Sequence, residues 1–217
     1  MQILLSDTGK RFNRDWIFRN FSFQFNSSES YAITGPNGSG KSTLLQVIAG
    51  AVATSEGTVA YESGSKKVEG DEMFRFLSIA APYQELIEEM TLTEFLQFHR
   101  TFKPFVSSIS IEDIVSMIHL SGAAGKQIRY YSSGMKQRVK LAQAFFSDTP
   151  VLLLDEPCTN LDEDGIRLYH HLISEYSSNR IVIVSSNDVA EYGFCNQKIF
   201  MGDIGSKKTI SGLQSAD

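Results

Sequence analysis

The chain has 217 residues, of which 42% are apolar, and its formal net charge is −5. A chain of this size and apolar content can bury a sizeable core, so we expect a globular protein. The acidic balance argues against a nucleic-acid-binding protein. No apolar run approaches the roughly 18 to 20 residues needed to span a bilayer, and the apolar part of the N-terminal MQILLSDTGK is too short for a secretion signal. We therefore expect a cytoplasmic protein.

The N-terminal part of the chain has the pattern of antiparallel strands. In residues 18–25, FRNFSFQF, phenylalanines alternate with serine and glutamine, which is typical of a strand with one buried face. Residues 57–70, GTVAYESGSKKVEG, read as a second strand that enters a Gly/Ser turn. These patterns predict an antiparallel β part at the start of the protein.

Three other segments are short, continuous apolar runs bounded by turn residues: SYAIT at 30–34, PVLLLDE at 150–156 and RIVIVSS at 180–186. Such runs indicate strands buried on both faces of a parallel sheet. Helical spacing of apolar residues lies between them, at Met135, Val139, Ala142 and Phe146, and at Ile166, Tyr169, Leu172 and Tyr176. Alternating strands and helices predict an α/β fold with a mainly parallel sheet. Residues 85–130 show only helical periods, so we expect an inserted helical subdomain at about 85–135.

The most specific motif is GPNGSGKST, which follows an apolar strand and opens a helix. It fits the pattern G-x-x-x-x-G-K-[ST], in which glycines let backbone N–H groups point at phosphate oxygens. Lys41 then reaches the β- and γ-phosphates, and the Ser42 hydroxyl binds Mg²⁺. The predicted nucleotide-binding residues are Gly35, Pro36, Asn37, Gly38, Ser39, Gly40, Lys41, Ser42 and Thr43.

Two carboxylates follow the buried run VLLL. Asp155 stands at the carboxyl end of that strand, where open α/β sheets bind ligands, and we expect it to hold Mg²⁺ opposite Ser42. Glu156 comes next and is the candidate general base that accepts a proton from the attacking water. A strand that simply ends in solvated acids is the alternative, and the nearby phosphate loop makes it the weaker one.

The segment YYSSGMKQRVKLAQAF stands just before the DEP strand. A Ser-Gly element in this place resembles the signature motif of the ABC ATPases, whose common form is LSGGQ. Residues 131–135 occupy the five positions here, and only Ser132 and Gly134 match. These two can offer a hydroxyl and an unhindered N–H to phosphate at a helix N-terminus, while an ordinary serine cap is the alternative.

The resemblance covers nearly the whole chain and implies further roles. Phe12 resembles the aromatic residue that stacks on adenine, with Trp16 as the fallback and a core position as the alternative for both. Gln84 resembles the glutamine that reaches Mg²⁺ and water, and Asp162, in TNLD, resembles the loop that contacts a partner subunit. The implied fold is a P-loop NTPase core with an N-terminal antiparallel β subdomain and an inserted α-helical subdomain.

The family resemblance also implies how the protein works. Two such domains dock head to tail around ATP and Mg²⁺, and hydrolysis reopens the pair. The implied partners are a second ATPase subunit, identical or different, and an integral-membrane permease that holds the protein at the inner face of the cell membrane. A nucleotide-gated regulatory subunit with weak hydrolysis is the alternative.

Asn187 is the position that separates these two functions. In the family a histidine commonly follows the last buried strand and touches the γ-phosphate, whereas this chain has RIVIVSSN there. An asparagine amide donates a hydrogen bond but carries no charge and reaches less far. The alternative is that Asn187 or Asp188 only caps the helix that begins near Val189.

Overall fold

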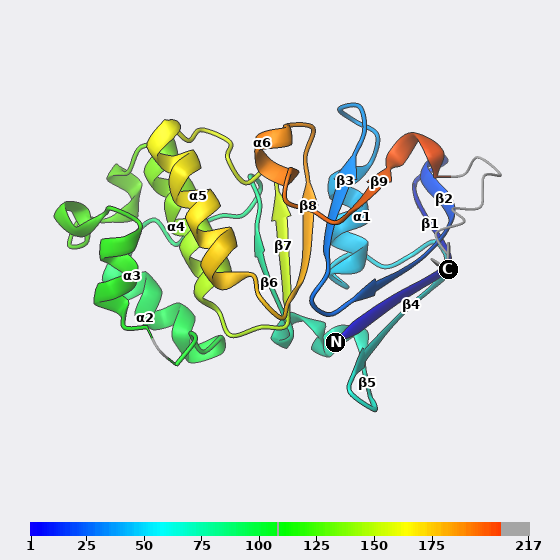
Figure 1. Cartoon of the computed structure of the whole chain (residues 1–217), viewed down its shortest axis with the longest axis horizontal. Helices are drawn as coiled ribbons and strands as arrows, with labels where there is room; N and C mark the ends of the chain where they lie inside the picture. Colours follow the sequence, from blue (N-terminus) through cyan, green and yellow to red (C-terminus); the bar gives the residue numbers. More distant parts are fainter. Residues whose placement is uncertain (108, 205–217) are drawn as a thin grey trace, which may run out of the picture.

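The computed structural model describes residues 1–107 and 109–204, which form two sheets with helices around them (Figure 1). The first sheet is antiparallel, in the order β2-β1-β4-β5, and consists of β1 (Gln2–Phe12), β2 (Asp15–Asn26), β4 (Glu56–Ser63) and β5 (Lys66–Val68). The second is parallel, in the order β6-β7-β8-β3-β9, and consists of β3 (Ser30–Thr34), β6 (Leu77–Ala80), β7 (Val151–Asp155), β8 (Ile181–Ser185) and β9 (Gln197–Phe200). The predicted α/β fold with an antiparallel N-terminal part is confirmed.

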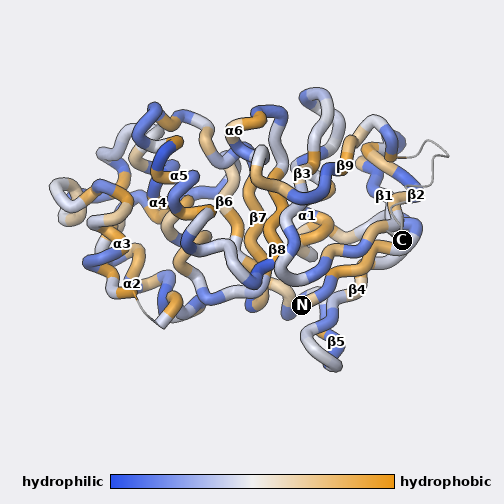
Figure 2. The backbone as a smooth tube through the Cα atoms, in the orientation of Figure 1, coloured by the Kyte–Doolittle hydropathy of each residue, from blue (hydrophilic) through white to orange (hydrophobic). Residues whose placement is uncertain are grey.

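The central strands β7 and β8 are buried on both faces, as their continuous apolar sequences predict (Figure 2). Leu152, Leu154, Val182 and Val184 belong to one core, which they share with α4 (Ser133–Phe146) and α5 (Glu163–Tyr176). Val151, Leu153, Ile181 and Ile183 belong to a second core, which they share with α1 (Lys41–Ile48) and the antiparallel sheet. Because side chains alternate between the two faces of a strand, both faces need apolar residues.

The segment from 85 to 130 contains two helices, α2 (Leu92–Phe102) and α3 (Ile111–Met117). Each begins with a capping box, formed by Thr91 with Glu94 and by Ser110 with Asp113, which satisfies backbone N–H groups at the helix start. Two short 3₁₀ turns follow, at Ser121–Ala123 and Ile128–Tyr130. The buried faces of α2 and α3 share one core with α4 and α5. That this segment acts as a separate subdomain stays a prediction.

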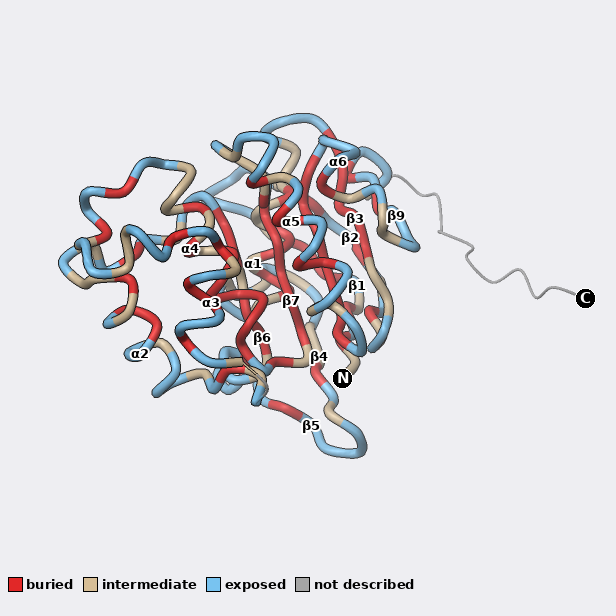
Figure 3. The backbone as a smooth tube through the Cα atoms, turned by 60° about the vertical axis from the view of Figure 1, so that its left-hand side comes forward, coloured by how far each residue is buried: buried red, intermediate tan, exposed pale blue. Residues whose placement is uncertain are grey.

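Exposure along the chain follows these layers (Figure 3). β7 is buried throughout, whereas buried and exposed residues alternate along the outer helices. Two further 3₁₀ turns lie at Gly70–Arg75 and Met201–Asp203, and a one-turn helix, α6 (Val189–Tyr192), follows β8. Within the described ranges, no helix is both long enough and apolar enough to cross a bilayer.

The parallel sheet brings three loops to one edge. β3, β7 and β8 are neighbours, and Ser185 pairs in register with Ile33 on one side and Asp155 on the other. Because parallel strands all end at the same edge, the segments that follow Thr34, Asp155 and Ser185 meet there. These segments carry the phosphate-loop motif, Glu156 and Asn187.

Candidate nucleotide-binding site

The loop between β3 and α1 has a backbone that only glycine readily adopts. Gly35, Gly38 and Gly40 have φ angles of 144°, 79° and 96°. At Gly40 an added Cβ would lie 2.3 Å from Cγ2 of Ile17, so space as well as conformation requires glycine. Among the described residues, no side chain caps α1 at Gly40, and no acidic residue stands in its first turn. The first N–H groups of α1 and its partial positive charge are therefore available to an anion.

Lys41 opens α1 and is buried, with only 6% of its surface exposed. Its Nζ donates hydrogen bonds to the carbonyl oxygens of Gly35 at 2.9 Å and of Pro36 at 3.4 Å. The ammonium is thus folded onto the loop that it belongs to. Phosphate oxygens are stronger acceptors than neutral carbonyls, so a bound polyphosphate can replace these contacts.

A cavity of about 240 Å³ lies over the loop. Its lining residues are Ile17, Asn37, Gly38, Gly40, Lys41, Ser42, Thr43 and Glu156. Residues from three separate parts of the sequence therefore meet at one site. The structure brings the predicted base Glu156 to the phosphate loop.

Asp155 is the last residue of β7 and is 2% exposed. Its Oδ1 is buried and has no hydrogen-bond partner among the described residues, and the same is true of the Ser185 Oγ. The two residues are in register on neighbouring strands, so their side chains face the same side of the sheet. A buried carboxylate oxygen without a partner is costly, and a divalent cation would offset that cost. The unpartnered oxygen of Asp155 fits a ligand of Mg²⁺, and Ser42 lines the phosphate-loop cavity. That the two hold one ion together stays a prediction.

Glu156 has the unusual backbone φ of 43° for a residue that is not glycine. This left-handed conformation turns the chain sharply at the end of β7, and the Glu156 N–H donates to the carbonyl of Ser185 at 2.9 Å. Strain of this kind costs about 1–3 kcal/mol and persists where the surroundings fix it. The turn exposes the Glu156 side chain at the cavity instead of burying it in the sheet.

Asn187 contacts the phosphate loop directly. Its Oδ1 accepts a hydrogen bond from the Gly35 N–H at 3.1 Å, and its Nδ2 donates to Oδ1 of Asn37 at 3.3 Å. Asp188, not Asn187, caps α6, by accepting from the Ala190 N–H at 2.9 Å. Asn187 therefore contacts the phosphate loop, and the neighbouring residue Asp188 caps the helix.

Gln84 is not brought to this cavity. Its Oε1 accepts from the Ala81 N–H at 3.1 Å, and the side chain lines another cavity of about 220 Å³ with His99 and Gln143. The geometry gives no support to Gln84 as a ligand of Mg²⁺. The residue before Gln84, Tyr83, has the pKa of its phenol raised to about 12, first by partial burial and then by the negative charge of Asp155.

Of the candidate adenine-stacking residues, Phe12 is 47% exposed and Trp16 is 37% exposed, and neither lines the phosphate-loop cavity. The Trp16 ring lies against the guanidinium of Arg19, 4.1 Å from the ring centroid. Ile17 lines the cavity instead. A β-bulge leaves it without a partner on β1, because Lys10 pairs with Phe18 and Arg11 pairs with Trp16. Sequence alternation alone does not reveal a bulge, so this residue was missed.

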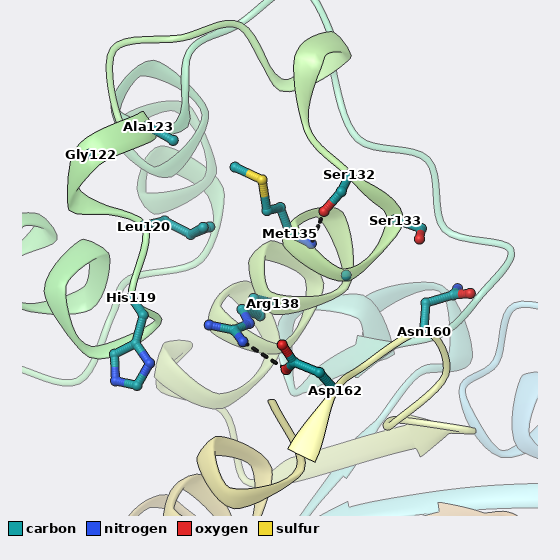
Figure 4. A pocket seen from close by; sticks show the side chains of 11 residues that line it. His119, Leu120, Gly122, Ala123, Ser132, Ser133, Met135, Arg138, Asn160 and Asp162 are labelled. Atoms are coloured by element: carbon teal, nitrogen blue, oxygen red, sulfur yellow. Dashed lines mark hydrogen bonds and ion pairs between the residues drawn. The ribbon is translucent and has the colours of Figure 1, made fainter. Parts of the chain in front are cut away.

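Ser132 and Gly134 lie at the start of α4, where they line a separate cavity of about 520 Å³ (Figure 4). Ser132 caps the helix, with its Oγ accepting from the Met135 N–H at 3.2 Å. Gly134 sits close to the loop after β7, and an added Cβ would lie 2.9 Å from the Asn160 carbonyl oxygen. Asp162 completes the wall through an ion pair with Arg138 at 3.0 Å.

The phosphate loop at a helix N-terminus, with Asp155 and Glu156 at the neighbouring strand end, defines a nucleoside-triphosphate-binding protein of the P-loop class. A family model described as "ABC transporter" matches residues 18–159. The chain belongs to this family, and it is an ATP-binding protein of the ABC ATPase type.

Curated relatives and solved structures agree with this assignment. The chain is 31% identical to a cytochrome c biogenesis ATP-binding export protein of Rhizobium etli over 86% of this chain and 87% of the relative. It is 33% identical to an uncharacterized ABC transporter ATP-binding protein of Bacillus subtilis, over 90% of this chain and 67% of the relative. A putative ABC transporter ATP-binding protein from Pyrococcus furiosus has the same fold, with a TM-score of 0.79 at 19% identity over 94% of this chain and 99% of that one. The structure of a dimeric ATP-binding cassette bound to ADP and phosphate also has this fold, with a TM-score of 0.76 at 24% identity. The match covers 97% of this chain and 100% of that one.

Proposed function

We propose that this protein is the ATP-hydrolysing subunit of a membrane transporter, and that it works as a head-to-tail dimer. One observation carries the proposal. The phosphate-loop cavity and the cavity at Ser132 and Gly134 are separate, and no described residue lines both. Each therefore supplies half of an ATP site, and a second ATPase subunit, identical or different, would supply the other half.

The residues divide the chemistry among them. Lys41 and the loop N–H groups neutralise phosphate charge, and Glu156 accepts the proton of the attacking water. Mg²⁺, held by Ser42 and Asp155, would supply positive charge that stabilises the developing negative charge on the phosphates. Asn187, anchored on Gly35, fixes the segment after β8 against the phosphate loop.

The partner subunit would complete the site. Its Ser132 hydroxyl and the N-terminus of its α4 would approach the phosphates from the open side, and closure would exclude water. Phosphoryl transfer depends on positioning and charge neutralisation, so one subunit alone is expected to turn over slowly.

The membrane partner is proposed to bind a groove beside the helical segment. This groove, of about 580 Å³, is lined by residues that include Gln46, Phe74, Tyr83 and Lys103. Phe74 lines this groove and is 56% exposed. Phe102 is 67% exposed and lines an adjoining cavity that shares Ile79 and Lys103 with the groove. An apolar surface of this kind suits a permease segment at the inner face of the cell membrane.

A test replaces Phe102 and Phe74 by Asp and measures how much permease co-purifies with the protein from membranes. We expect recovery to fall by about tenfold or more, because two buried carboxylates would oppose the contact. The matched control is Phe200→Asp, since Phe200 is 45% exposed but lies on β9 and lines neither the groove nor the adjoining cavity of Phe102. Equal recovery with all the variants would contradict docking at this surface.

A second candidate function is a nucleotide-gated regulatory subunit with weak hydrolysis. The observation in its favour is that the uncharged amide of Asn187 stands between β8 and the phosphate loop. Turnover in the assembled transporter separates the two functions.

A further inference from the structure

Glu191 is a buried carboxylate outside the nucleotide cavity. It lies on α6 and is only 5% exposed. A buried carboxylate needs hydrogen-bond donors, and here its Oε1 accepts from the Cys158 N–H at 2.6 Å. This donor is a backbone group in the loop that directly follows Glu156.

The contact joins two segments that are far apart in the sequence. Cys158 comes two residues after Glu156, and Glu191 comes four residues after Asn187. α6 is itself fixed from behind, because the buried Tyr169 hydroxyl of α5 donates to the Glu191 carbonyl at 2.6 Å. The backbone that carries the Glu191 side chain is therefore held in place by α5.

The loop after Glu156 needs such a contact. Glu156 and Asn160 have φ angles of 43° and 63°, so residues that are not glycine hold a left-handed backbone at both ends of the loop. Strained segments keep one conformation only when neighbouring groups over-determine it. The bond to Cys158 lies between these two residues, and a second bond, from Gln137 Nε2 to the Pro157 carbonyl at 2.7 Å, lies beside it.

The electrostatics agree with the geometry. Burial raises the pKa of Glu191, and the negative charges of Asp188 and Glu156 raise it further, whereas hydrogen bonds from Ser186 and Cys158 lower it. The carboxylate thus interacts with the segment after β8 and with the loop after β7 together. It does not line the phosphate-loop cavity.

We propose that Glu191 is a positioning residue that locks the loop carrying Glu156 to the segment carrying Asn187. The proposal rests on the roles proposed for these two residues. It assigns Glu191 no contact with nucleotide. Its effect is to keep the water-activating carboxylate at one distance from the phosphates.

The test compares Glu191→Ala with Glu191→Gln, which keeps an oxygen acceptor for the Cys158 N–H. We expect Glu191→Ala to lower kcat by roughly 10- to 100-fold, since a displacement of about 1 Å can cost about 100-fold. The ATP Kd should stay within about twofold, because Lys41 and the loop N–H groups are untouched. Glu191→Gln should recover most of the lost kcat.

Two further measurements separate positioning from general loosening. Amide hydrogen exchange in residues 158–160 should speed up in Glu191→Ala and not in Glu191→Gln, a readout that does not depend on hydrolysis. The control Thr91→Ala removes the side-chain cap of α2 and leaves the contacts of Glu191 in place, so it should lower Tm with kcat within about twofold.

The proposal is overturned if Glu191→Ala keeps the wild-type kcat, if Glu191→Gln loses as much kcat as Glu191→Ala, or if Thr91→Ala loses as much kcat as Glu191→Ala. Unchanged amide exchange in residues 158–160 of Glu191→Ala also overturns the proposal. Failure of the proposed site looks different, because then Glu156→Gln would hydrolyse ATP at the wild-type rate.

Discussion

Asn187 ties the segment after β8 to the phosphate loop through both atoms of its amide. It accepts from the Gly35 N–H and donates to Asn37. A histidine at this place would reach further and would share developing charge as an imidazolium. The amide gives a fixed contact without charge, so its effect on hydrolysis can be measured by substitution.

We expect Asn187→His to raise turnover. Losing one well-placed donor to a transition state costs about 2.7–4 kcal/mol, so a full gain would approach 100-fold. The surrounding contacts are built around an amide, and a donor about 1 Å out of place loses about 100-fold. The expected gain is therefore several-fold, with little change in ATP affinity. The measurement is steady-state phosphate release at saturating ATP with the partner present.

Asp188→Ala is the matched control for this experiment. It removes the cap of α6 and should lower stability by about 0.5–2 kcal/mol without raising turnover. An Asn187→His protein that binds ATP normally but is no faster than wild type would exclude a catalytic benefit of the longer side chain.

Local sequence was enough to predict where some of the site residues lie. The phosphate loop needs a contiguous pattern of glycines and a lysine, and Glu156 follows an uninterrupted apolar strand, so both were placed at one site. Gln84 was different, because a single glutamine in a loop has no periodicity that fixes where its side chain points. Ile17 and Glu191 gave no signal, since one depends on a bulge and the other is an acidic residue that looks solvated in sequence.

At the scale of elements, the continuous apolar runs predicted the three central strands of the parallel sheet. Two edge strands were missed, β6 and β9, which have four residues each. β9 buries only Ile199, so it carries neither alternation nor an apolar run. Such strands form because β7 and β3 offer backbone partners, which is a tertiary effect.

Helix α2 contains a partly buried titratable group, His99, that makes stability depend on pH. The His99 ring lies between Phe95 and Phe105, and its Nε2 contacts the Ser147 Oγ at 2.9 Å. Burial, and then the charge of Lys103, lower the pKa of His99 to about 4. The unfolded chain binds this proton near pH 6.5, so the stabilising contribution is complete above pH 6.5 and is lost as the pH falls toward 4.

Between pH 7.5 and pH 5, His99 should therefore account for a loss of about 2 kcal/mol in the free energy of unfolding. The measurement is urea unfolding of wild type and His99→Gln at both pH values. The glutamine variant keeps a polar group for Ser147 but has no proton to bind in this range. If both proteins lose the same free energy between the two pH values, His99 is not the group responsible.

The whole molecule has two separate cavities, which we propose to be the two halves of ATP sites shared between subunits. The phosphate-loop cavity lies at the edge of the parallel sheet, and the cavity of Ser132 and Gly134 lies at the start of α4. Because the two cavities do not meet within one chain, ATP bound between two chains should hold the two chains together. Any substitution that blocks hydrolysis but leaves ATP binding intact should preserve this ATP-linked dimer.

Glu156→Gln is such a change, because the amide keeps the shape of the side chain but cannot accept the proton of the attacking water. We expect hydrolysis to fall by about 10²- to 10⁴-fold, the usual contribution of a general base, while ATP stays bound. The variant should then be a dimer with ATP and a monomer without it, as measured by light scattering after gel filtration. Adding Lys41→Ala removes the buried ammonium beside the phosphates and should abolish both ATP binding and the dimer. Wild-type turnover in Glu156→Gln would exclude Glu156 as the base, and a dimer that forms without ATP would show that another surface holds the two chains together.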